Sequence, residues 1–303
     1  MNNRGRVIGI FAWLGLLAST ADAGPITFLT ALPVARAQVI LRGQYFFIRA
    51  SDDPTPQGRD LTVQAVPIAA AVGLTPRLAV FGIIPIVDKS LDVGTPGGRR
   101  TLSASGLGDV VAFARYTVVA VDRVGSTFRI APFGGVKIPT GDDDRAGELG
   151  RLPRSLQPGS GSWDGLGGVV VSVQTTQWEF DADAGIRKTT DADQFRFGNQ
   201  AFADASFQYR VWPRRLGGGV PGFVYAVVET NVVSQGRSQA GGVADPDSGG
   251  LRWDVDLGLQ YAAVNYIVEG LVQIPVADNP NGTGLRSDYR VVVGLRWNLS
   301  LPF

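Results

Sequence analysis

Carboxylates occupy every second position in two stretches of the sequence: Glu179, Asp181 and Asp183 in one, Asp254 and Asp256 in the other. Two carboxylates on one face of a strand could in principle do general acid–base work. The chain contains no His and no Cys, which argues against His-based catalysis, imidazole metal sites and thiol chemistry. We therefore predict no enzyme activity, no catalytic residue, no metal site and no cofactor, and interpret the carboxylates as the wetted face of their strands.

Basic residues follow the same alternation in other segments. We predict that the polar positions of all these segments face one lumen, lined by Arg42, Arg115, Arg129, Lys137, Glu179, Asp181, Asp183, Asp204, Glu229, Asp254, Asp256, Glu269, Arg290 and Arg296. Most basic residues would then gather on one side and the acidic residues opposite, with Arg187 and Arg210 as exceptions. Two interpretations stay open. The charges could set up a transverse field that favours polar or zwitterionic solutes and hinders bulky apolar ones, or they could form cross-barrel ion pairs that fill the lumen.

The elements that position these residues are strands with one apolar and one polar face. In 287–303 every second residue is apolar: Tyr289, Val291, Val293, Leu295, Trp297, Leu299, Leu301 and Phe303. A period of two puts successive side chains on opposite faces of a strand. An apolar outside and a charged inside suit lipid on one side and water on the other; the alternative is a strand of a soluble sandwich. We predict an all-β fold, an antiparallel up-and-down transmembrane β-barrel of about 12 strands over 38–303, with Phe303 as the signal that the barrel assembly machinery reads.

The connections between the predicted strands alternate between long polar loops and short turns. The long ones are 51–60, 88–107, 140–162, 189–198, 235–250 and 277–287. Outer-membrane barrels have long outer loops and short periplasmic turns, so we expect both termini at the periplasmic side. Proline removes a donor from the strand ladder, and we expect bulges or early strand ends at Pro67, Pro85, Pro132 and Pro275.

Aromatic residues gather near the ends of the predicted strands. An outer-membrane barrel carries aromatic girdles at both membrane interfaces, on either side of an apolar band. We predict that these girdles contain Trp178, Trp253, Tyr261, Tyr266, Tyr289 and Trp297.

The N-terminus reads as a secretory signal. Arg4 and Arg6 precede an apolar core over 7–18, and Ala21-Asp22-Ala23 offers a small-x-small cleavage site. We predict a signal peptide over 1–23 and an irregular lead-in over 24–37, with a short plug inside the lumen as the alternative for the lead-in. The formal net charge of +1 does not suggest a nucleic-acid partner, and the predicted location is the outer membrane of a Gram-negative cell.

Five motifs carry a resemblance to a known family. They are LPVARAQVILRGQYFFIR near the start, LTPRLAVFGIIPIVD (74–88), GLGDV (106–110), KIPTGD (137–142) and GSGSWDG (159–165). In this order and spacing they resemble the phenol meta-pathway outer-membrane family, whose members are described as transporter-like barrels found with aromatic-degradation genes. The resemblance implies an outer-membrane barrel that takes up small, often hydrophobic compounds, and it supplies no catalytic residues.

The sequence therefore predicts a channel or transporter for passive uptake of small molecules, aromatic or hydrophobic compounds among them. Its expected partners are outer-membrane lipid, the barrel assembly machinery and a small-molecule solute. The alternatives are a structural or adhesive barrel that binds partners through loops 140–162 and 235–250, and a barrel enzyme. The acidic run 142–144 is interpreted as a solvated loop rather than a cation site.

Overall fold

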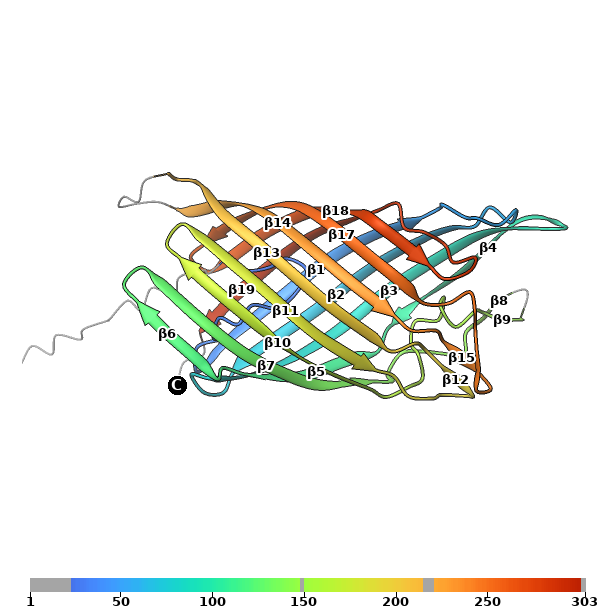
Figure 1. Ribbon diagram of the computed structural model, residues 1–303, viewed down its shortest axis with the longest axis horizontal. Coiled ribbons are helices and arrows are strands. Elements are labelled where there is room, and N and C mark those ends of the chain that lie inside the picture. The colour runs from blue at the N-terminus through green and yellow to red at the C-terminus, as the bar shows by residue number, and fades with distance from the viewer. Residues whose placement is uncertain (1–22, 148–149, 215–220, 301–303) are drawn as a thin grey trace, which may run out of the picture.

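The computed structural model describes residues 23–147, 150–214 and 221–300. The expected signal peptide, apart from Ala23, and the expected assembly signal Phe303 lie outside these residues. Twelve long strands form a closed antiparallel barrel, as predicted (Figure 1). They are β1 (Gln38–Ala50), β2 (Asp60–Gly73), β3 (Leu78–Thr95), β5 (Val110–Tyr116), β7 (Ser126–Ile138), β10 (Asp164–Thr175), β11 (Trp178–Lys188), β13 (Gln200–Trp212), β14 (Gly222–Gln235), β17 (Gly250–Ala263), β18 (Tyr266–Pro280) and β19 (Tyr289–Ser300).

Pairing of the first strand with the last closes the barrel. β1 pairs with β19 from Gln38 opposite Ser300 to Arg49 opposite Tyr289. Because of this pairing, called the seam, neither strand has an open edge. The backbone N–H and C=O groups of an open edge could not form hydrogen bonds to lipid. We call the end where β1 begins and β19 ends the short-turn end, and the opposite end the long-loop end. The short-turn end is the one expected to face the periplasm.

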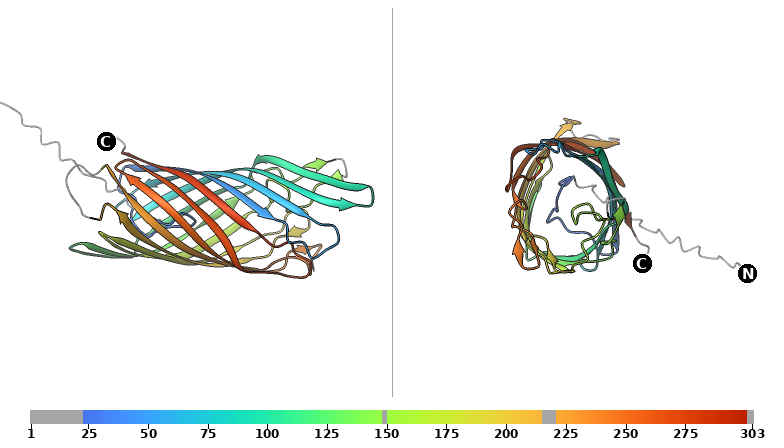
Figure 2. Two further views of the ribbon diagram at one scale, coloured as in Figure 1. Left: turned by 90° about the horizontal axis from the view of Figure 1, so that it is seen from above. Right: turned by 90° about the vertical axis from the view of Figure 1, so that its right-hand side faces the viewer.

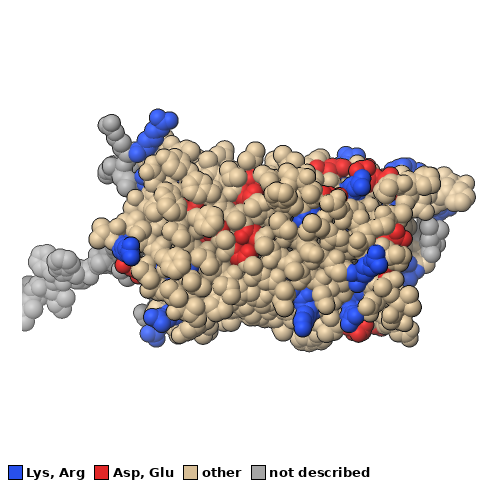
Figure 3. All heavy atoms as spheres, viewed as in Figure 1, with Lys and Arg blue, Asp and Glu red and all other residues tan. Residues whose placement is uncertain are grey.

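Side chains alternate along the barrel strands as the sequence predicts. Leu257, Trp297 and Val293 point outward and are 57%, 50% and 49% exposed, whereas the neighbouring Asp256 and Val292 are fully buried. On the face of the barrel that Figure 3 shows, a wide central zone consists mostly of uncharged residues, and most Lys and Arg lie toward the ends. An apolar outer face around a polar-lined interior is the pattern of a transmembrane β-barrel. No helix long and apolar enough to cross a bilayer occurs among the described residues.

The stretch 88–107, predicted as a Gly-rich loop, is instead a β-hairpin. β3 continues to Thr95, and β4 (Gly98–Leu107) returns along it with Ile86 opposite Leu107 and Thr95 opposite Gly98. The hairpin projects beyond the other strands at the long-loop end (Figure 1). The loop prediction was wrong because a glycine at the tip, Gly98 with a φ of 109°, makes the tight turn that joins two strands.

Three of the four prolines lie where the strand ladder changes. Pro85 lies where β3 exchanges its partner β5 for β4, and Pro132 where β7 exchanges β5 for β6 (Val119–Arg123). Pro275 adjoins a register shift between β17 and β18. A proline costs little where one side of the strand needs no donor. Pro67 lies opposite Pro85 without a shift, so the expected bulge is absent there.

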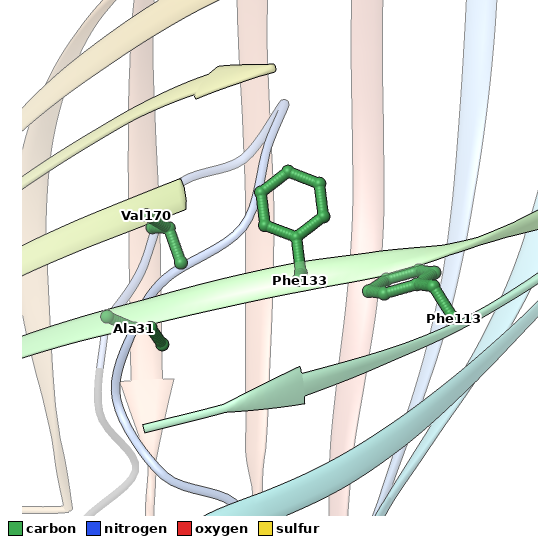
Figure 4. Packing of buried hydrophobic residues seen from close by; sticks show 5 residues of the cluster. Ala31, Phe113, Phe133 and Val170 are labelled. Carbon is green, nitrogen blue, oxygen red and sulfur yellow. The ribbon is translucent and has the colours of Figure 1, made fainter. Parts of the chain in front are cut away.

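Residues 24–37 form no strand and run inside the barrel. The view along the barrel axis shows this segment, in blue, within the ring of strands (Figure 2). Its apolar side chains are buried against the wall: Ile26 packs on Val227 and Leu271, and Ala31 packs beside Phe133 and Val170 (Figure 4). We call residues 24–37 the plug.

The long-loop end is also partly filled from within. Loop 140–162 contains the short pair β8 (Ala146–Gly147) and β9 (Gly150–Arg151). Beyond it, Leu152 and Leu156 are buried against Ala104 of β4. Three further short strands form a small sheet between loops 189–198 and 235–250: β12 (Phe195–Arg196), β15 (Gln239–Ala240) and β16 (Val243–Ala244).

Candidate functional site

The side of the lumen where the acidic residues gather, here called the acidic wall, accepts hydrogen bonds from backbone N–H groups of the plug. Glu229 of β14 accepts the backbone N–H groups of Ile26 at 2.7 Å and Thr27 at 3.0 Å, and the hydroxyl of Thr27 at 2.5 Å. On β10, the hydroxyl of Ser172 accepts the backbone N–H of Ala31 at 2.7 Å. A carboxylate that accepts several N–H groups makes charge-assisted hydrogen bonds, which are stronger than neutral ones.

The basic wall binds the backbone acceptors of the same segment. Arg42 and Gln44 of β1 both donate to the carbonyl of Ile26, at 2.8 Å each. Arg115 of β5 donates to the carbonyls of Thr30 and Leu32. The acidic and basic residues of the lumen therefore hold the plug between them. Backbone N–H groups of the plug bind the acidic wall, and its carbonyl groups bind the basic wall.

Ion pairs across the lumen are few among the described residues. Arg42 lies 2.6 Å from Glu269, and Arg296 lies 3.7 Å from the same carboxylate. Asp254 pairs with Arg252 of its own strand at 2.9 Å. These ion pairs join residues of one strand or of the adjacent strands β18, β19 and β1 rather than opposite walls, and the plug fills much of the space between the walls.

Other carboxylates on the acidic wall join an amide network. Asn231 donates to Asp204 at 2.8 Å, and Gln273 donates to Asp256 at 2.9 Å and to Asn231 at 2.8 Å. Asp183 of β11 lies directly opposite Asp204 of β13 in the register. Among the described residues, no group of His, Cys, Asp or Glu could hold a metal ion.

A cavity of about 510 Å³ lies between the plug and the barrel wall. Its charged lining comprises Arg42, Arg115, Asp183, Arg187, Asp204 and Arg296. Most of the other wall residues are apolar: Ile40, Phe46, Pro67, Ala69, Ala70, Ala71, Phe81, Ile83, Val111, Phe113, Phe133, Leu166 and Phe202. The sequence analysis predicted only charged lining for the lumen, whereas this side of it is mostly apolar, since several strands are apolar on both faces.

Four phenylalanines form a continuous row along the apolar wall, here called the phenylalanine row. Phe81 and Phe113 are stacked with centroids 4.6 Å apart, Phe113 meets Phe133 edge-on at 6.3 Å, and Phe133 lies 6.5 Å from Phe202. Phe113 and Phe133 belong to one buried cluster with the plug residue Ala31 (Figure 4). Such spacings suit aromatic–aromatic contact.

Two glycines make room for the end of this row. A Cβ at Gly168 would lie 2.7 Å from the ring of Phe133, and one at Gly185 would lie 2.5 Å from the ring of Phe202. Both positions face inward, since Gly168 and Gly185 pair with each other between β10 and β11. The two rings can lie against the barrel wall only because these positions have no side chain.

The predicted lumen residues lie in three places. Arg42, Arg115, Asp183, Asp204 and Arg296 line the cavity, as noted above. Five more are buried on the inner face without lining it: Glu179, Asp181, Glu229, Asp254, Asp256. Glu269 is buried at the seam, and Arg290 has a buried Nε with no hydrogen-bond partner among the described residues.

Two predicted residues serve other structures. Arg129 binds Asp122 of the β6–β7 hairpin at 2.6 Å, at the short-turn end and away from the cavity. Lys137 is buried and binds Asp109 at 2.7 Å and Asp164 at 3.1 Å. Both lie on the inner face of β7, where these local ion pairs keep them away from the cavity.

The glycine-rich motifs of the sequence meet around Lys137. Asp109 of GLGDV accepts the Lys137 ammonium of KIPTGD, the backbone N–H of Gly141 at 3.1 Å and the Ser160 hydroxyl of GSGSWDG at 2.7 Å. We call this network the latch, because it ties both ends of loop 140–162 to the barrel rim. The run 142–144 forms ion pairs instead of a cation site: Asp142 binds Arg145 and Asp143 binds Arg154.

The long loops are also joined to each other. Asp193 accepts from Arg151 at 3.1 Å and from Arg154 at 3.0 Å. These hydrogen bonds, from Arg151 and then Arg154, hold the pKa of the Asp193 carboxyl below its ordinary value.

All six predicted girdle residues lie on the outer face near strand ends. Tyr266 pairs with Trp297 at the short-turn end, and Tyr261 lies 6.3 Å from Tyr266. Trp178 of the same end lies 6.1 Å from Phe207. At the long-loop end, Trp253 is 45% exposed and Tyr289 is 39% exposed.

Sequence reasoning missed the phenylalanine row as lining. A signal was present for the part of the apolar wall that includes Phe81, because 61–73 and 78–87 carry no charged residue on either face. A strand that is apolar on both faces must present an apolar face to the lumen.

Comparisons with known proteins found a matching family model and similar solved structures. A family model described as "Putative MetA-pathway of phenol degradation" matches residues 62–284. The crystal structure of the COG4313 outer membrane channel from Pseudomonas putida F1 has a TM-score of 0.67 at 14% identity, over 92% of this chain and 100% of that chain. The β domain of the Bordetella autotransporter BrkA has a TM-score of 0.48 at 13% identity, over 86% of this chain and 99% of that one. No match was found among curated proteins.

The first of these structures shows the fold that both chains share, a barrel of the outer-membrane type. Together with the apolar outer face, this fold agrees with the predicted location in the outer membrane of a Gram-negative cell. The resemblance noted from the motifs is confirmed as well. The matched residues 62–284 cover well over half of the sequence, so the chain belongs to the family described as "Putative MetA-pathway of phenol degradation".

Proposed function

We propose that the protein is a passive outer-membrane channel for small molecules that carry an apolar or aromatic group. The observation that carries this proposal is the cavity of about 510 Å³ between the plug and the apolar wall. Ligand sites for small molecules are concave, mostly apolar and provided with a few polar groups. The cavity has this composition, since a few charged and polar side chains interrupt a mostly apolar lining.

The phenylalanine row supports the preference for rings. A ring that moves along the apolar wall exchanges one aromatic neighbour for the next, so no single position has to bind it strongly. Conduction needs this combination of sites that are favourable enough to enter and weak enough to leave. The expected partners remain outer-membrane lipid, the barrel assembly machinery and the solute.

Planar bilayers test the proposal. The purified mature protein is expected to give discrete single-channel currents in potassium chloride. Benzamide, a neutral aromatic, is expected to reduce the current as it occupies the cavity, and acetamide at the same concentration serves as the control without a ring. A correctly folded barrel that passes no current, or one that acetamide blocks as well as benzamide does, would contradict the proposal.

A further inference from the structure

Arg187 differs from the other arginines that line the cavity. Arg42 and Arg296 bind Glu269, and Arg115 binds carbonyls of the plug. Arg187 also lines the cavity, but it has no hydrogen bond or ion pair to any residue that the structure describes. A guanidinium without a partner beside an apolar wall is a strong potential donor to a planar anion.

The register of β11 and β13 places an aromatic ring next to this cation. Arg187 lies opposite Gln200, Gly185 opposite Phe202, and Asp183 opposite Asp204. All of these positions face inward. From the long-loop end toward the short-turn end, the wall therefore presents a guanidinium, then a phenylalanine ring that lies over a glycine, then two carboxylates.

Spacing along the strand fits a ring with one charged group. Arg187 and Asp183 are four residues apart, which corresponds to roughly 13 Å along a strand. A ring packed against Phe202 can direct a carboxylate to Arg187 while it keeps that carboxylate away from Asp183 and Asp204. The reverse orientation would bring like charges together, which is unfavourable.

We propose that Arg187 and Phe202 form a binding site for aromatic carboxylates, with the guanidinium on the carboxylate and the phenylalanine against the ring. The inference rests on the proposed channel function, whose substrate class it narrows to aromatic monoacids. Arg187 determines this specificity by direct contact with the solute. A planar guanidinium can bind a carboxylate through two parallel N–H groups, a geometry that a neutral amide does not match.

Three ligands of nearly equal shape test whether the site prefers an anion, a neutral amide or a cation: benzoate, benzamide and benzamidinium. Binding of each to the detergent-solubilised mature protein is measured by calorimetry. Benzoate is expected to bind the native protein more tightly than the other two do. The Arg187→Gln variant is expected to lose about tenfold in benzoate affinity while its benzamide affinity stays unchanged. Arg187→Lys, which keeps the charge but loses the planar donor pair, is expected to lie between the two.

The matched control is Lys188→Gln, which removes the same charge from the next residue, on the outer face of β11. It is expected to leave benzoate binding unchanged, and circular dichroism and heat-dependent gel mobility check that each variant forms the barrel. Equal benzoate affinity in the native protein and in Arg187→Gln would overturn the inference, and so would an absence of benzoate binding to the native protein. Tighter binding of benzamidinium would also overturn it and assign the site to Asp183 and Asp204.

The bilayer recordings and the calorimetry together distinguish this inference from the channel proposal. If the bilayer shows current and a block by benzamide, but benzoate binding does not depend on Arg187, only the carboxylate site is wrong. If the barrel passes no current, the channel proposal fails, whatever calorimetry shows.

Discussion

The carboxylate of Glu229 accepts the backbone N–H of Ile26 at 2.7 Å, although the two residues are 203 positions apart in the sequence. A carboxylate on the barrel wall thus fixes the plug by its main chain, independently of most of the plug's side chains. Glu229 is itself buried, so it depends on nearby donors, which are those of the plug and the hydroxyl of Ser206 at 3.1 Å. The plug and the acidic wall stabilise each other.

Replacement of Glu229 by Gln is expected to loosen the plug. The amide loses the charge and turns a donor toward the backbone N–H of Thr27, so charge-assisted hydrogen bonds are lost. Because the native chain has no Cys, a single cysteine in Phe28→Cys reports on the plug through its rate of maleimide labelling. We expect that rate to rise by about tenfold in the Glu229→Gln background.

The control for this experiment is Asp254→Asn. Asp254 is a buried carboxylate of the neighbouring strand that binds Arg252 and has no hydrogen bond to the plug among the described residues. If Asp254→Asn accelerates labelling as much as Glu229→Gln does, a general weakening of the barrel explains the effect and the specific role of Glu229 is wrong.

Deletion of residues 24–35 should raise the single-channel conductance severalfold. The plug occupies the lumen that its two walls enclose, and the current must at present pass beside it. The deletion leaves charged side chains on the wall, among them Arg42 and Glu229, but these can hydrate once the segment is gone. Conductance equal to that of the native protein would mean that ions do not pass through the lumen beside the plug.

Replacement of Lys137 by Met should release loop 140–162 from the rim. The ammonium lies between the buried carboxylates of Asp109 and Asp164, and loss of one partner from a buried charge pair costs about 3–5 kcal/mol. We expect trypsin to cleave the loop of the variant at Arg151 or Arg154 while the native loop resists. The comparison is Lys89, whose ammonium binds the carbonyls of Ser155 and Gln157 at 3.0 Å and 2.7 Å. Lys89→Met breaks no ion pair to a residue that the structure describes and should leave more of the protection in place.

The barrel itself was predictable because each strand carries its own signal. Val291, Val293 and Leu295 alternate with polar or small residues, and that alternation is set by which side of the sheet meets lipid. The number and order of the strands, and the closure by β19, follow from repeated local patterns. The hairpin over 88–107 was not predicted, because its glycines are equally typical of a loop.

The lumen could be predicted only in part. The inward direction of Arg42, Glu229 and the other charged residues follows from the same alternation. Their partners do not, because Arg42 and Glu229 bind backbone atoms of the plug, and backbone groups leave no trace in the residue types of the segment that supplies them. The cavity could not be predicted for a related reason. Its shape depends on how the plug divides the lumen, and the pattern of a single strand carries no information on that.

Acid should break the ion pairs by which Asp193 of loop 189–198 binds Arg151 and Arg154 of loop 140–162. Arg151 and Arg154 lower the pKa of Asp193 in the folded protein, so the carboxylate contributes stability that is present above its ordinary pKa of about 3.9 and is lost as the pH falls through the folded value. Spin labels at Ser155→Cys and Lys188→Cys should therefore report a wider distance distribution at pH values well below 4 than at pH 7. Asp193→Asn should show the wide distribution at both pH values, and Asn also tolerates the left-handed backbone of this position, with a φ of 48°. A narrow distribution in that variant would show that the ion pairs do not hold the loops.

Substitution of Gly185 by Ala should shrink the cavity without a change in charge. The added Cβ would lie 2.5 Å from the ring of Phe202 and 2.6 Å from the carbonyl of Gly167, so the ring must move toward the lumen. Overpacking of this kind costs about 1–3 kcal/mol, and the displaced ring takes up space that a solute would need. We expect a lower thermal midpoint, and benzamide affinity reduced more than that of the smaller acetamide. Gly165→Ala supplies the control, because a Cβ at Gly165 meets nothing within 4 Å. A lowered thermal midpoint would show that the clash occurs in Gly185→Ala. If benzamide still blocked this variant as it blocks the native protein, aromatic solutes would not pass along the phenylalanine row.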